Sequence, residues 1–154
     1  MHPSRAAGLP RFWAATLWLL TALFFLRVAG QALQRWWPQA WLPPFSEWQG
    51  SSIAYPMLLA TQLLILAAMA LASHWAWKGT MRSTRVRMWA ATWIGGIYML
   101  AAIARPVIGF TVPDSHPWFH APISSAFHVV LAGFILALAR YHGLGLTTRA
   151  GGAQ

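Results

Sequence analysis

Cysteine is absent from this sequence of 154 residues. Its absence excludes disulfide bonds, thiolate catalysis, zinc sites held by cysteine and iron–sulfur clusters. The usual redox indicator of cellular compartment is therefore missing as well. The compartment has to be inferred from where the chain places its charges.

Acidic residues are almost as rare, because Glu47 and Asp114 are the only two. Neither lies in a long apolar stretch, whereas intramembrane hydrolases and proton-coupled transporters generally use acids inside their membrane spans. The sequence also contains no H-E-x-x-H motif, no serine nucleophile elbow and no glycine-rich phosphate loop. These absences favour a protein without catalytic activity.

Long apolar stretches fill most of the chain. Hydrophobic residues make up 58% of it and charged residues 8%, against about a quarter charged in soluble domains. Four stretches are each near the roughly 20 residues that cross a bilayer: Phe12–Ala29, Ala54–Trp77, Met88–Phe110 and Pro122–Tyr141. They predict an all-α integral membrane protein, a single up-down bundle of four transmembrane helices over residues 1–154. The first stretch is longer than the apolar core of a signal peptide, so we expect a retained helix that ends near Gly30.

Basic residues gather on one side of the predicted bundle. They precede the first span, fill the loop between the second and third, and follow the fourth: Arg5, Arg11, Lys78, Arg82, Arg85, Arg87, Arg140 and Arg149. The positive-inside rule then predicts that both termini and the 78–87 loop are cytoplasmic. The net charge of +9 indicates topology and contact with anionic lipid headgroups rather than nucleic-acid binding, because the charges are divided among short juxtamembrane pieces. Frequent Arg and Trp beside a single Lys suggest a GC-rich bacterial genome, so we expect a bacterial inner membrane.

Tryptophans concentrate in the predicted outer loop between the first two spans. The loop contains three prolines, which prevent a long helix, and four tryptophans: Trp36, Trp37, Trp41 and Trp48. Tryptophan favours the headgroup layer of a membrane. The loop is therefore expected to anchor the bundle as an aromatic belt, to cover a pocket, or to dock a partner subunit.

Each predicted span places one polar side chain in the same layer of the membrane. These residues are Arg27, Gln62, Arg105 and His128. At 1.5 Å per residue, all four are expected within about 5–12 Å of the outer boundary. Polar residues inside a membrane are costly, so this layer is the predicted site. Pro106 should kink its helix and turn Arg105 inward.

Two interpretations of this layer concern the four residues themselves. In the first, they are satisfied by structural partners: Arg105 pairs with Asp114, Arg27 pairs with Glu47 or a lipid phosphate, and His128 bonds to a neighbouring helix. In the second, they bind a cofactor or a lipid-like ligand that arrives from the outer leaflet. Histidine and arginine suit the carbonyl acceptors of a quinone, and His128 suits the axial position of a haem.

A third interpretation is a metal site in the loop before the last span. Asp114, His116 and His120 offer a carboxylate and two imidazoles, which are ligands for zinc or copper. The pattern is weak because no further ligand is obvious nearby. His74 does not help a bis-histidine haem, since it is predicted near the opposite membrane surface from His128.

Two classes of function follow. The first is a non-catalytic accessory or assembly subunit of a larger membrane complex, for example an electron-transfer complex, docked through its tryptophans or to further copies of itself. The second is a small redox or cofactor-binding protein that holds a quinone, haem or metal. Transport by a lone four-helix chain would need oligomers. Gly95 and Gly96 predict close helix packing, inside the bundle rather than between copies.

Overall fold

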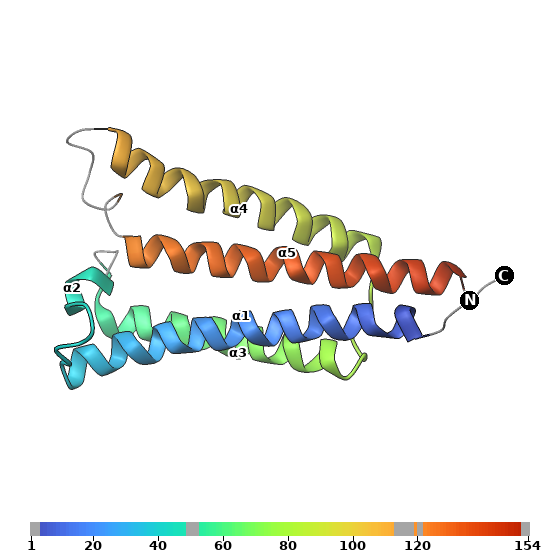
Figure 1. The fold of residues 1–154 in the computed structure, drawn as a ribbon, viewed down its shortest axis with the longest axis horizontal. Coiled ribbons are helices and arrows are strands. Elements are labelled where there is room, and N and C mark those ends of the chain that lie inside the picture. The colour runs from blue at the N-terminus through green and yellow to red at the C-terminus, as the bar shows by residue number, and fades with distance from the viewer. Residues whose placement is uncertain (1–3, 49–52, 113–118, 120–121, 152–154) are drawn as a thin grey trace.

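The computed structural model describes residues 4–48, 53–112, 119 and 122–151. These residues form α-helices and contain no strand. The helices are α1 (Ser4–Trp36), the single-turn α2 (Phe45–Trp48), α3 (Tyr55–Trp77), α4 (Arg85–Thr111) and α5 (Pro122–Gly151) (Figure 1). The predicted all-α class is confirmed.

The four long helices are long and apolar enough to span a membrane, as the sequence predicted. The candidate spans are Pro10–Trp36, Tyr55–Trp77, Arg85–Thr111 and Ile123–Thr147. Many large apolar side chains on them, such as Leu64, Leu100 and Phe110, are exposed rather than buried. Helices that are apolar on their outer as well as their inner faces suit a lipid surrounding.

The expected end of the first helix near Gly30 is wrong, because α1 continues to Trp36. Gly30 has a packing role instead. A Cβ atom at this position would lie 3.0 Å from Cη2 of Trp48, so the missing side chain lets the indole of α2 lie against α1. A glycine inside a membrane helix commonly marks such a close approach.

Local signals set the ends of α3 and α4. Pro56 occupies the first turn of α3, where its missing N–H is not needed. Gly79, with a φ of 66°, adopts the left-handed conformation that ends α3. The Thr84 hydroxyl then accepts a hydrogen bond of 3.2 Å from the backbone N–H of Arg87 and caps α4.

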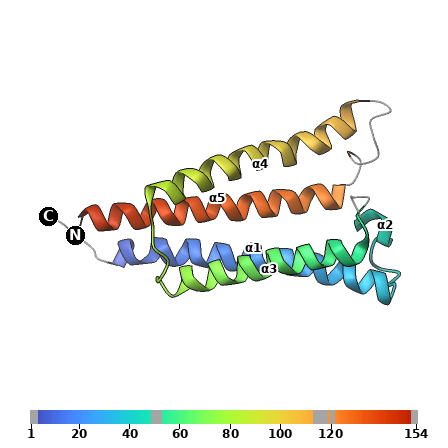
Figure 2. The same cartoon turned by 180° about the vertical axis from the view of Figure 1, so that it is seen from behind.

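The long helices run alternately up and down, and their order across the molecule is α3, α1, α5, α4. Close backbone contacts join α4 with α5, α5 with α1, and α1 with α3, whereas α3 and α4 make few or none. The first described residues of α1 and the last of α5 lie at the end that carries the α3–α4 connection (Figures 1 and 2). We call this the basic end and the opposite one the α2 end.

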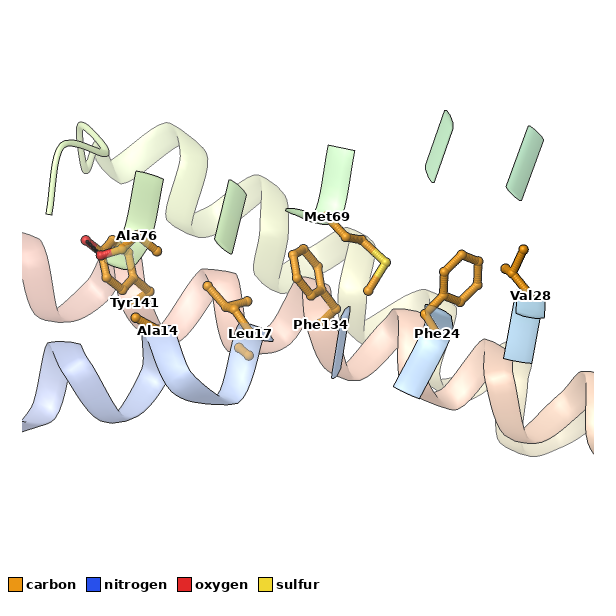
Figure 3. Close-up of a cluster of buried hydrophobic side chains, with 9 residues drawn as sticks. Ala14, Leu17, Phe24, Val28, Met69, Ala76, Phe134 and Tyr141 are labelled. Carbon is orange, nitrogen blue, oxygen red and sulfur yellow. Dashed lines mark hydrogen bonds between the residues drawn. The ribbon is translucent and has the colours of Figure 1, made fainter. Parts of the chain in front are cut away.

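The apolar core lies where α1, α3 and α5 meet. Leu17 and Phe24 of α1, Met69 of α3 and Phe134 of α5 are buried there together with several alanines (Figure 3). Lipid is as apolar as these side chains, so packing and hydrogen bonds rather than water exclusion hold the helices together.

Hydrogen bonds between helices reinforce this core. The hydroxyls of Thr21 on α1 and Ser73 on α3 lie 3.1 Å apart, and the Tyr141 hydroxyl donates to the Ala76 carbonyl at 3.1 Å. The three core helices are thus tied by both apolar and polar contacts, whereas α4 depends mainly on α5.

Candidate functional site

A cavity of about 330 Å³ lies among α1, α3, α4 and α5 toward the α2 end. Its lining includes apolar side chains from α1, α3 and α5, such as Phe24, Ile65 and Leu131. It also includes Arg27, Gln62, Arg105 and His128. The structure therefore brings together all four residues of the predicted polar layer, one from each long helix.

Arg27 of α1 supplies a buried guanidinium that is only 6% exposed. Its Nη1 donates to Oε1 of Gln31 at 2.8 Å, and its Nη2 donates to the Trp48 carbonyl at 3.3 Å. The guanidinium carbon also lies 5.5 Å from the ring centre of Phe127, a cation–π contact. These three partners are neutral, so their dipoles and the aromatic face solvate the charge without cancelling it.

An amide chain leads from Arg27 to the cavity wall formed by α3. Oε1 of Gln31 also accepts a hydrogen bond of 3.1 Å from Nε2 of Gln62. The arginine can only donate, which makes this Gln31 atom the oxygen and the facing Gln62 atom the nitrogen. Oε1 of Gln62 is the other end of this amide. It has no hydrogen-bond partner among the described residues, although the residue is only 5% exposed. Within the same described part of the chain, Nε2 of Gln31 and the Tyr55 hydroxyl are likewise buried without a hydrogen-bond partner.

Two polar contacts close the opposite wall between α4 and α5. The hydroxyl of Tyr98 lies 2.5 Å from Nδ1 of His128. Nη1 of Arg105 donates to Oγ of Ser124 at 3.3 Å. Pro106 lies inside α4, and the Arg105 side chain is buried, as the sequence predicted.

Of the two predicted ion pairs, the structure describes both partners of one, Arg27 and Glu47. Arg27 bonds to the Trp48 carbonyl and Gln31 rather than to Glu47, because α2 presents its backbone to the guanidinium. Asp114, the predicted partner of Arg105, lies outside the described residues.

The proposed metal ligands Asp114, His116 and His120 also lie outside the described residues. Within the part of the chain that the structure describes, no three His, Asp or Glu side chains gather as metal ligands would. His74 is exposed near the end of α3 at the basic end, far along the bundle from His128.

The four loop tryptophans divide into two groups. Trp36, Trp37 and Trp41 are 55%, 69% and 75% exposed. Trp48 is 8% exposed, lies on Gly30 and donates its indole N–H to the Pro43 carbonyl at 3.0 Å. The ring of Trp48 thus already packs within the bundle, whereas docking of a partner through the other three tryptophans stays a prediction.

Three residues at the site escaped the sequence analysis. Gln31 was assigned to a loop because the first helix was expected to end one residue earlier. Tyr98 precedes Arg105 by seven residues and therefore shares its helix face, a signal that would have identified it. Ser124 precedes His128 by four residues, the same kind of signal.

A larger cavity of about 680 Å³ lies at the basic end between α4, α5 and Trp13 of α1. Its polar lining consists of Arg140 and Thr92, and the Thr92 hydroxyl already donates to the Met88 carbonyl at 2.8 Å. Ligand sites generally combine an apolar cavity with several convergent polar groups. The smaller cavity meets that description better.

The volume and lining of the smaller cavity restrict what it can hold. About 330 Å³ is near the lower limit of roughly 300–1,000 Å³ for small-molecule sites, which suits one ring or one headgroup better than a haem macrocycle. Arginine, amide and imidazole groups suit an oxygen-bearing head. No protein family, curated protein or solved structure matches this chain.

Proposed function

We propose that this protein binds the polar head of a lipid-soluble molecule in the cavity among its four long helices. The observation that carries the proposal is the convergence of Arg27, Gln62, Arg105 and His128, each from a different helix, on one cavity. Polar groups in a membrane protein are costly unless they have a partner or a use. A quinone ring or a phosphate-bearing headgroup would provide that use.

The lipid-soluble character of the ligand is inferred from the arrangement of the helices. Because α3 and α4 make few or no close backbone contacts, the ligand's apolar tail can leave between them into the bilayer. Thr61 of α3 is exposed and also lines the cavity, so it marks this opening. In the predicted topology the opening faces the outer leaflet of a bacterial inner membrane.

Two single-cysteine variants test that topology. Ser46 in α2 and Thr80 in the α3–α4 connection are both exposed, and the wild-type chain has no cysteine to interfere. In intact cells, a membrane-impermeant maleimide should label the Ser46→Cys variant and not the Thr80→Cys variant. Lysed cells should give equal labelling of both. The reverse pattern in intact cells would place the cavity in the inner leaflet.

Blocking the opening tests the proposed function. Thr61→Trp should fill it with an indole, whereas Leu64→Trp adds the same ring to an exposed position on the same helix outside the cavity lining. Native mass spectrometry of protein taken from its own membrane in mild detergent should show a bound small molecule in the wild type and in Leu64→Trp. The adduct should fall at least about tenfold in Thr61→Trp, which corresponds to about 1.4 kcal/mol. An undiminished adduct in Thr61→Trp, or no adduct in the wild type, would contradict the proposal.

A second candidate is the non-catalytic accessory or assembly subunit. It is supported by Trp36, Trp37 and Trp41, which are exposed together at the α2 end, since aromatic residues are enriched in protein interfaces. The same native spectra distinguish the two functions. A complex that contains other polypeptides would favour the subunit, with a bound small molecule as its cofactor or lipid.

A further inference from the structure

We propose that the bound head is anionic and carries a hydroxyl group, as the phosphodiester headgroup of phosphatidylglycerol does. This inference rests on the proposed function, because it names the chemical class of the ligand for the same cavity. Two separate observations on the described residues support it. Arg27 has no acidic partner among them, and Oε1 of Gln62 has no donor among them.

The anionic character follows from Arg27. A buried ion is strongly unfavourable unless an opposite charge or dense hydrogen bonding accompanies it. Gln31, the Trp48 carbonyl and the Phe127 ring supply neutral contacts, and the cavity lining that the structure describes includes no carboxylate. Arg105 on α4 adds a second guanidinium to the lining. A phosphate oxygen placed in the cavity would gain charge-assisted hydrogen bonds that are stronger than neutral ones.

The hydroxyl group follows from Gln62. Its Oε1 is a buried acceptor that meets no donor in the part of the chain that the structure describes. The hydrogen bonds of Gln31 identify this atom as the oxygen, so its partner must be a donor. Leaving such a buried acceptor unpaired costs about 1–3 kcal/mol. A phosphate diester has no donor on its phosphate, and a quinone offers acceptors alone. An ammonium donor would be repelled by Arg27, whose guanidinium shares the Gln31 oxygen with Gln62. A neutral hydroxyl avoids both problems.

Lipids that differ in one feature at a time test this inference on the wild-type protein. Delipidated protein in non-ionic detergent would be titrated with phosphatidylglycerol, phosphatidylmethanol or phosphatidylcholine of the same acyl chains. Native mass spectrometry would measure the affinity for each lipid. Phosphatidylmethanol keeps the charge and lacks the hydroxyls, whereas phosphatidylcholine is zwitterionic and lacks them too. We expect phosphatidylglycerol to bind about tenfold more tightly than phosphatidylmethanol, and phosphatidylmethanol about tenfold more tightly than phosphatidylcholine. Equal affinity for phosphatidylglycerol and phosphatidylcholine would overturn the inference.

A matched variant locates the hydroxyl contact. Gln62→Met has a similar shape and no polar atoms, so it should remove the preference for phosphatidylglycerol over phosphatidylmethanol and retain the preference for phosphatidylmethanol over phosphatidylcholine. If the first preference survives in Gln62→Met, the hydroxyl lies elsewhere and that part of the inference fails. Deacylated glycerophosphoglycerol at the same concentration should not compete, because it lacks the tail. Effective competition would identify a water-soluble ligand instead.

Two further results separate this inference from the proposed function. In the first, the wild type binds ubiquinone or ubiquinol but not phosphatidylglycerol, and Thr61→Trp abolishes the quinone binding. This result would refute the anionic head and support the proposed function. In the second, Thr61→Trp changes neither lipid binding nor quinone binding. This result would refute both proposals.

Discussion

Replacing Arg27 by methionine is expected to weaken phosphatidylglycerol binding by roughly tenfold to a hundredfold, while the helical bundle remains folded. Hydrogen bonds to charged groups contribute about 1.5–3 kcal/mol, which corresponds to this range. The bundle should tolerate the change because methionine retains an apolar side chain on α1 and removes a buried charge that lacks an acidic partner among the described residues. Replacing a buried ion by an apolar residue is often neutral or stabilising.

A matched variant controls for the loss of positive charge in general. Arg35 lies eight residues further along α1, is exposed, and stacks on Phe45 rather than facing the cavity. Arg35→Met therefore removes the same charge and should leave lipid affinity within about twofold of wild type, because exposed charges at this distance are largely screened by salt. Arg27→Lys should give an intermediate loss, since it keeps the charge but not the planar, forked set of donors.

Native mass spectrometry measures lipid affinity, and circular dichroism with size-exclusion chromatography measures folding. Equal weakening by Arg27→Met and Arg35→Met would show that lipid is attracted by overall charge rather than by the cavity. An unfolded Arg27→Met variant beside a folded Arg27→Lys variant would instead assign Arg27 to holding α2 through the Trp48 carbonyl.

The sequence was sufficient for the helices and for the four polar residues of the cavity. Long apolar stretches specify helices in lipid because backbone groups there must bond within their own segment. The depth of Arg27, Gln62, Arg105 and His128 could be counted from helix ends because helical rise is constant. Hydropathy and counting were thus enough to place the four residues in one layer, and the structure adds that they share one cavity. That the cavity binds a cofactor stays a prediction.

The details that decide chemistry depend on packing between segments far apart in the chain, which hydropathy does not encode. In the sequence, Gly30 resembles the end of a helix. The structure shows instead that it makes room for the Trp48 ring. Gln31 becomes part of the site only because α1 continues past that glycine. Hydropathy also could not predict which helices are neighbours. The same apolar stretches are compatible with a closed bundle, in which α3 and α4 touch, and with the observed order, in which they lie apart.

Gly95→Leu is expected to separate α4 from α5 and to abolish lipid binding. A Cβ atom at Gly95 would lie 3.0 Å from Cγ and Cδ2 of Leu136 and 3.1 Å from Cγ2 of Ile135, so a leucine there would force these α5 side chains to move. Because α4 depends mainly on α5 for its contacts, its displacement should also break the pair between Tyr98 and His128. Overpacking of this kind costs about 1–3 kcal/mol, and the cavity would lose one wall.

Gly96→Leu is the control, because a Cβ atom at Gly96 would meet nothing within 4 Å. Leucine improves helix propensity by up to about 1 kcal/mol relative to glycine, so this variant should match or exceed the thermal stability of wild type and keep its lipid. Thermal unfolding followed by circular dichroism, with native mass spectrometry of each variant, measures both properties. The comparison also tests whether the two glycines serve the bundle or an interface between copies. If Gly96→Leu, and not Gly95→Leu, disrupted an oligomer and released the lipid, the site would be completed by a second copy and the assignment of Gly95 as the critical contact would be wrong.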